Sequence, residues 1–115
     1  MITVDEKGGI LIARLTSEDR FNALIADRVK DMLLSYYATP GTKLVFDLEG
    51  IKFIDSSGFG VFLSLMKAAN NSNGKFKICN LKPDVMELFQ VLQLHNVFDI
   101  YNSFDECVSS FKEEQ

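Results

Sequence analysis

Cysteine, proline and histidine are scarce in this chain, which holds two cysteines, two prolines, one histidine and no tryptophan. Cys79 and Cys107 are far apart, and neither has a second cysteine or a histidine at the spacing of metal ligands. These features exclude a disulfide-rich scaffold and a common zinc motif, and they indicate two reduced thiols in a cytosolic protein. The lone His95 is expected to be a turn residue rather than a base or a metal ligand.

Sequence motifs of catalysis are also missing. The chain has no Gly-x-Ser-x-Gly elbow for a serine nucleophile, and its single histidine gives poor support for a catalytic triad. No glycine-rich loop followed by lysine is present to hold the phosphates of a nucleotide. We therefore expect a protein that is not an enzyme and needs no cofactor.

Positive charge and long apolar runs are lacking too. The net charge is −4 and no basic stripe is visible, which counts against nucleic acid or an anionic membrane as a partner. No apolar run approaches the ~20 residues of a membrane span, and no N-terminal signal pattern is found. We expect a cytoplasmic protein.

Apolar residues, in contrast, are abundant. They make up 47% of the 115 residues, and ten of them are phenylalanine. A chain of this length and composition can bury a core without metal or disulfide support. Because no linker, repeat or low-complexity tract interrupts it, residues 1–115 are expected to form one domain.

Apolar periodicity changes several times along the chain. Alternation around the Lys7-Gly8-Gly9 turn predicts a hairpin, and further short apolar runs predict later strands. The expected strands cover residues 2–6, 10–16, 43–48 continuing over 51–54, 76–79 and 97–101. Helical spacing and helix-start signals predict helices over residues 22–37, 56–69, 83–92 and 104–111. This order indicates an α/β fold, in which about four helices pack on a mostly parallel sheet of four to five strands with an N-terminal hairpin.

The most informative segment is Phe53-Ile54-Asp55-Ser56-Ser57-Gly58-Phe59-Gly60, where a predicted strand leads into a helix. The start of a helix presents unpaired N–H groups and a partial positive charge, which suit a phosphate. The pattern has a simpler interpretation, because a serine can cap a helix and glycines permit close packing. Phe59 fits the apolar stripe of this helix only loosely and is expected to point outward.

The segment Asp55–Gly60 resembles the signature of the anti-sigma factor antagonists, which are STAS domain proteins of bacterial partner-switching systems. The apolar stretches Leu44–Leu48 and Phe76–Leu81 support the resemblance, which covers nearly the whole chain. Two features depart from the family pattern. Phe59 stands where leucine is common, and the loop over Ser17–Asn22 does not align cleanly.

The resemblance implies that Ser56 is a phosphorylation site. It also implies that the unphosphorylated protein binds an anti-sigma factor that is a serine kinase, and so frees the sigma factor. Phosphorylation by this kinase would release the protein, and a metal-dependent serine phosphatase would reverse the modification. Two other functions stay open: a docking subunit that is not phosphorylated, for example of a lipid transporter, and a sensor of a small anion or nucleotide.

Several residues are candidates to support Ser56 or to bind the partner. Asp55, Ser57 and Gly58 lie next to it in the sequence. Asp55 is expected to cap the helix, to orient the serine for phosphoryl transfer, or to contact the partner directly. Because sites gather at the carboxyl ends of strands, the loop that holds Asp19, or Glu18 in its place, is expected beside Ser56. The expected partner-binding residues are Phe59, Gly60, Leu63 and Lys67.

Overall fold

The computed structural model describes residues 1–113 of the chain. This part of the chain contains seven strands and four helices, in the order β1-β2-β3-α1-β4-β5-α2-β6-α3-β7-α4. The strands are β1 (Ile2–Lys7), β2 (Ile10–Leu15), β3 (Arg20–Phe21), β4 (Lys43–Asp47), β5 (Phe53–Ile54), β6 (Lys75–Cys79) and β7 (Asp99–Tyr101). The helices are α1 (Ala23–Tyr36), α2 (Ser56–Asn71), α3 (Pro83–Val91) and α4 (Phe104–Lys112).

Five of the strands form one sheet in the order β1-β2-β4-β6-β7. The β1–β2 hairpin is antiparallel, and every other neighbouring pair in this sheet is parallel. The central strand β4 is buried along Leu44–Asp47, which explains its continuous apolar run. The predicted α/β class, the hairpin and the mostly parallel sheet are therefore confirmed.

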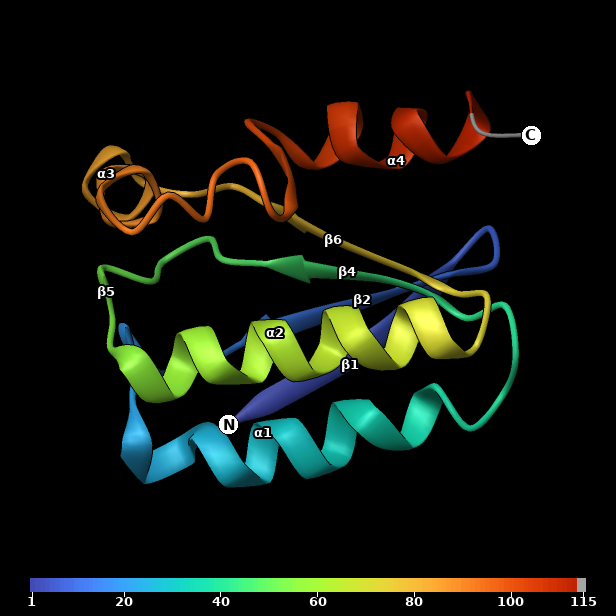
Figure 1. Cartoon of the computed structure of the whole chain (residues 1–115), viewed down its shortest axis with the longest axis horizontal. Helices are drawn as coiled ribbons and strands as arrows, with labels where there is room; N and C mark the ends of the chain where they lie inside the picture. Colours follow the sequence, from blue (N-terminus) through green and yellow to red (C-terminus); the bar gives the residue numbers. More distant parts are fainter. Residues whose placement is uncertain (114–115) are drawn as a thin grey trace.

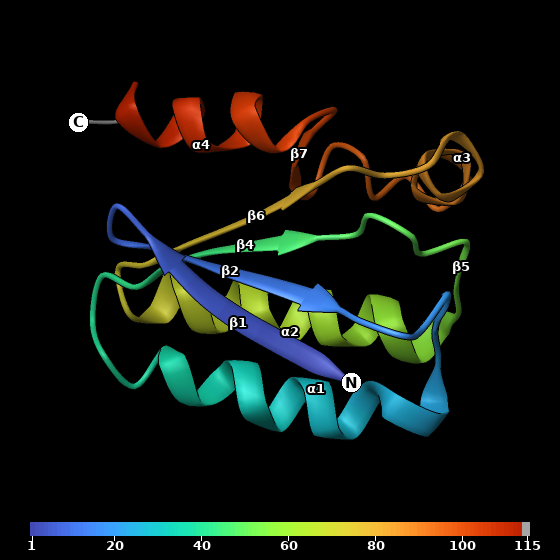
Figure 2. The same cartoon turned by 180° about the vertical axis from the view of Figure 1, so that it is seen from behind.

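Helices cover both faces of this sheet. Helices α1 and α2 lie side by side on one face, and α4 lies on the other (Figures 1 and 2). Beneath α1 and α2 the core is built from phenylalanine rings, and the ring of Phe62 lies 5.3–6.2 Å from those of Phe46, Phe76, Phe89 and Phe98. Such aromatic contacts add to the stability gained from burial of apolar area.

A smaller core under α4 contains both cysteines. Cys79 at the end of β6 and Cys107 on α4 are free thiols and fully buried. A hydrogen bond to Cys107, together with burial, raises the pKa of the Cys79 thiol. Cys79 therefore stays protonated at neutral pH and behaves as a structural apolar residue.

The sequence prediction was wrong where it extended a strand through residues 51–54. The chain turns after Asp47, and only Phe53–Ile54 is extended again. This segment, β5, pairs in parallel with β3, which the sequence did not predict, in a separate two-stranded sheet. The turn is fixed by a hydrogen bond from Ile51 N to Leu48 O and by Gly50, whose φ of 88° is unfavourable for other residues.

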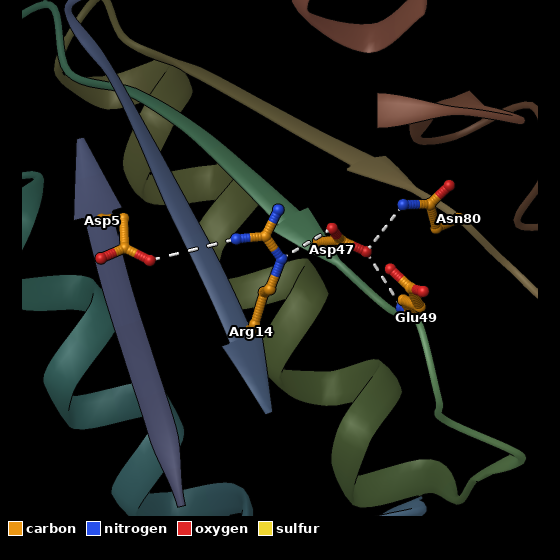
Figure 3. A network of polar contacts seen from close by, with 5 residues as sticks. All are labelled: Asp5, Arg14, Asp47, Glu49 and Asn80. Carbon is orange, nitrogen blue, oxygen red and sulfur yellow. Dashed lines mark hydrogen bonds and ion pairs between the residues drawn. The ribbon is translucent and has the colours of Figure 1, made fainter. Parts of the chain in front are cut away.

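A polar network ties the carboxyl ends of three strands together (Figure 3). The Asp47 carboxylate is buried at the end of β4 and accepts a hydrogen bond of 2.9 Å from Nε of Arg14 on β2. Its other oxygen accepts bonds of 3.0 Å from the side-chain amide of Asn80, just after β6, and from the backbone N–H of Glu49. The network thus also holds the turn that leads into β5.

Replacement of Asp47 by alanine is expected to lower the free energy of unfolding by about 2–3 kcal/mol, because three donors lose their acceptor. The loss is kept moderate by Arg14, whose side chain is 38% exposed and can be hydrated. Urea unfolding measures it. Asp5→Ala is the control, since Asp5 is exposed and meets Arg14 only at 4.0 Å. Its effect is expected to stay below about 0.5 kcal/mol, and equal losses in both variants would contradict this account.

Candidate functional site

Ser56 is the first residue of α2, and its side chain is exposed. The residue that caps this helix is Asp55. One oxygen of its carboxylate accepts hydrogen bonds from the backbone N–H groups of Ser57 (2.9 Å) and Gly58 (3.2 Å). A carboxylate in this position also suits the helix dipole. Asp55 therefore has the capping role, as one of its interpretations predicted, and neither serine is needed for that role.

Asp55 also joins two helices. Its second oxygen accepts a hydrogen bond of 3.3 Å from Ala23 N, at the start of α1. The N-termini of α1 and α2 thus meet at one half-buried carboxylate, beside the exposed Ser56. The sequence did not reveal this contact, although Asn22, which caps α1 through a bond of 3.0 Å to Leu24 N, could have marked where that helix starts.

The segment after β2 pairs with the segment that leads into the serine loop. The β3–β5 pairing aligns Arg20 with Phe53, and the carbonyl of Asp19 accepts a hydrogen bond of 2.7 Å from Lys52 N. The side chain of Asp19 is exposed. The Glu18 carboxylate instead lies 3.6 Å from the N-terminal amine, whereas Asp19 lies beside Lys52, four residues before Ser56, so that a role for Asp19 at Ser56 stays a prediction.

Three of the predicted partner-binding residues share one face of α2 with Ser56. Gly60, Leu63 and Lys67 follow at intervals of four, three and four residues, which places all of them on a single stripe of the helix. Leu63 and Lys67 are exposed and Gly60 is half-buried. Their role in binding stays a prediction.

The prediction that Phe59 points outward was wrong. Phe59 is 6% exposed, and its ring lies 5.0 Å from that of Phe89 on α3 and 6.3 Å from that of Phe62. Helix α3 covers the ring of Phe59, and the position of that helix could not be predicted from the sequence alone. Phe53, 40% exposed, is the aromatic residue that faces solvent near Ser56.

The two glycines after the serines differ in their surroundings. A Cβ at Gly58 would lie 2.7 Å from Ile54 Cγ2 and 2.8 Å from the carbonyl oxygen of Phe21, so α2 can approach β3 this closely only without a side chain there. A Cβ at Gly60 would meet no atom within 4 Å. Gly58 is thus required for packing, whereas Gly60 leaves the helix surface open.

Gly58→Ala is therefore expected to lower the free energy of unfolding by about 1–3 kcal/mol through overpacking. Gly60→Ala is the matched control and is expected to be neutral or to stabilise the protein by up to about 1 kcal/mol, since alanine is the better helix former. Denaturant unfolding of both variants measures the difference. If the two variants were equally stable, the close contact at Gly58 would not limit the fold.

The second serine has a different environment from the first. Ser57 is half-buried and lines a groove of about 370 Å³ between α1 and α2, which also includes Asp27 and Lys30. Ser56 does not line this groove. The two hydroxyl groups are therefore unequal in access to another protein.

Neither a metal site nor a membrane-spanning helix is found in residues 1–113. In this part of the chain no group of three or more histidine, cysteine, aspartate or glutamate side chains is arranged to hold a metal ion. Nor does any helix here have the length and apolar character to span a membrane.

Comparison with known proteins relates both the fold and the sequence to one family. The anti-sigma F factor antagonist of Paenibacillus polymyxa is 29% identical over 103 residues, which cover 89% of this chain and 86% of that protein. The structure of an anti-sigma-factor antagonist (STAS) domain protein from Planctomyces limnophilus superposes with a TM-score of 0.87 at 20% identity, covering 95% of this chain and 96% of the other.

A second solved structure, of the Bacillus cell fate determinant SpoIIAA in its phosphorylated form, superposes with a TM-score of 0.68 at 16% identity, and covers 96% of this chain and 99% of that one. At these identities the two structures establish the shared fold. The family model described as the STAS domain matches residues 1–107, which extend from the β1 hairpin into α4. This chain therefore belongs to the STAS domain family.

Proposed function

We propose that this protein is an anti-sigma factor antagonist of a bacterial partner-switching system, and that phosphorylation of Ser56 controls its binding. In its unphosphorylated form it binds an anti-sigma factor that is also a serine kinase, and so frees the sigma factor in the cytoplasm. The relative from Paenibacillus polymyxa, an anti-sigma F factor antagonist, supports this function. The observation that carries the proposal is that Ser56, directly after the capping Asp55, is an exposed residue.

The chemistry of the switch suits this position. The kinase transfers the γ-phosphoryl group of ATP to the Ser56 oxygen, the bond to ADP breaks, and the hydroxyl proton goes to a base of the kinase. The protein gains a charge of about −1.5 to −2 at neutral pH. Because the new charge lies at the N-terminus of α2, the fold gains about 0.3–1 kcal/mol from the dipole rather than being disrupted.

The protein itself acts as substrate and binding partner in this scheme, not as an enzyme. Asp55 holds α2 so that Ser56 faces the kinase, and Gly58 lets the helix start close to β3. A metal-dependent serine phosphatase removes the phosphate, with water as the acceptor, and restores the neutral hydroxyl. The metal belongs to the phosphatase.

The test is phosphorylation by the serine kinase of the same bacterium in the presence of ATP, followed by intact-mass measurement and site mapping. One phosphate on Ser56 is expected. Ser56→Ala should abolish the mass increase, whereas the matched variant Ser57→Ala should keep it, because Ser57 lies half-buried in the α1–α2 groove. A wild-type mass that stays unchanged would refute the proposal and favour a docking subunit that is not phosphorylated.

A further inference from the structure

Two exposed side chains next to the serine loop, Arg20 and Phe53, have no role in the site described so far. They face each other across the β3–β5 pair, and the Arg20 guanidinium lies over the Phe53 ring, 5.4 Å from its centroid. Phe53 is 40% exposed. A cation held over an aromatic ring in this way has its orientation restricted before any partner arrives.

The charge of Arg20 is not neutralised within the described chain. Within residues 1–113 no carboxylate lies within 4.0 Å of its guanidinium; the ion pairs there involve the N-terminal amine and Arg14. A guanidinium offers five N–H donors in a planar fork that matches a carboxylate. Arg20 is thus oriented by Phe53 while its donors stay available.

The backbone brings this pair close to Ser56. The segments 19–23 and 52–55 run side by side, since Lys52 N bonds to Asp19 O, Asp55 N bonds to Phe21 O, and Ala23 N bonds to the Asp55 carboxylate. Leu24, the second residue of α1, is 85% exposed at this same end. Arg20, Leu24, Phe53 and Ser56 therefore form one surface, which we call the Arg20 face.

We propose that the Arg20 face is the specificity-determining part of the docking surface, and that it takes a protein partner that presents a carboxylate to Arg20 and an apolar side chain to Phe53. This inference rests on the proposed function and names the chemistry of the partner. Arginine and aromatic residues dominate the binding energy of protein interfaces, and a bidentate carboxylate pair sets their register.

The same arrangement explains why a phosphate at Ser56 ends docking. A phosphate on Ser56, three residues after Phe53, would add a second anion to this surface and would compete with the partner's carboxylate for the guanidinium. It would also repel an acidic partner, because like charges across an interface oppose binding. The unphosphorylated Arg20 face accepts such a partner, since there the guanidinium is oriented but not ion-paired.

The test measures the dissociation constant of the complex with the anti-sigma factor kinase of the same bacterium, by titration calorimetry. Arg20→Glu is expected to weaken binding about 30-fold or more, and Phe53→Ala about tenfold. The control charge reversal is Lys112→Glu, because Lys112 is exposed on α4, which lies on the opposite face of the sheet from α1 and α2. It is expected to change binding less than about twofold. Melting temperatures establish that each variant is folded.

Kinetics and a compensating charge reversal distinguish a role of Arg20 in docking from a role in maintaining the fold. Arg20→Glu should raise KM for phosphorylation of Ser56 and leave kcat unchanged, and an acidic-to-arginine change at the facing position of the kinase should restore binding. Unchanged or tighter binding of the kinase by Arg20→Glu would overturn the proposal. If Ser56 is phosphorylated and the KM for this reaction does not change in Arg20→Glu, this inference alone is refuted. If the kinase binds in a manner that depends on Arg20 but does not phosphorylate Ser56, the proposed function alone is refuted.

Discussion

Truncation of Phe59 to alanine is expected to lower the free energy of unfolding by about 3–5 kcal/mol, the cost of removing a large buried ring. The ring lies in the core between α2 and α3, against Phe89 and Phe62. With the ring gone, α3 would lose a main contact with the helix that carries Ser56. A protein of this size has a total stability of only about 5–15 kcal/mol, so the variant should be barely stable at 37 °C.

Thermal and urea unfolding of Phe59→Ala measure this effect. The matched control is Phe53→Ala, which removes the same side chain from an exposed position and is expected to lose less than about 1 kcal/mol. The order of the two variants should reverse for binding to the kinase, because Phe53 belongs to the Arg20 face. A stable Phe59→Ala variant with weakened binding would instead show that Phe59 is an exposed residue that contacts the partner.

The sequence predicted those parts of the fold whose pattern extends over several residues. The hairpin around Gly8-Gly9 and the helices α1 and α2 have clear periodicity, and their starts lie within about one or two residues of the predicted positions. Strands β3 and β5 have two residues each, too few for any periodicity. Their existence depends on pairing between segments more than 30 residues apart, which only the folded chain reveals.

The site was predictable to the same extent. The motif directed attention to Ser56 and Asp55 because a helix start after a strand is visible in local sequence. The bond from Ala23 to Asp55 and the position of the Arg20 guanidinium over the Phe53 ring were not predictable, since both depend on the β3–β5 pairing. Phe59 was misplaced for a related reason, because its burial depends on α3, whose position no local pattern determines.

Phosphorylation of Ser56 is expected to weaken binding of the kinase at least about 100-fold while the free energy of unfolding changes by no more than about 1 kcal/mol. The two effects separate because the serine is exposed at the start of α2. In the free protein the phosphate interacts with the dipole of α2 and with solvent. In the complex it would instead face the surface of the partner. Little backbone rearrangement is needed for such a switch.

Phosphoserine placed at position 56 by genetic encoding allows both quantities to be measured on a homogeneous sample, by calorimetry with the kinase and by urea unfolding. Phosphoserine at position 109 is the matched control. Ser109 is exposed on α4, on the opposite face of the sheet, so the same charge there should leave binding unchanged. Equal losses at both positions would point to a general effect of net charge, and a large loss of stability at position 56 would mean that the modification acts by unfolding the loop. A surface switch requires that binding is weakened only by the phosphate at Ser56 and that this phosphorylated protein keeps its stability.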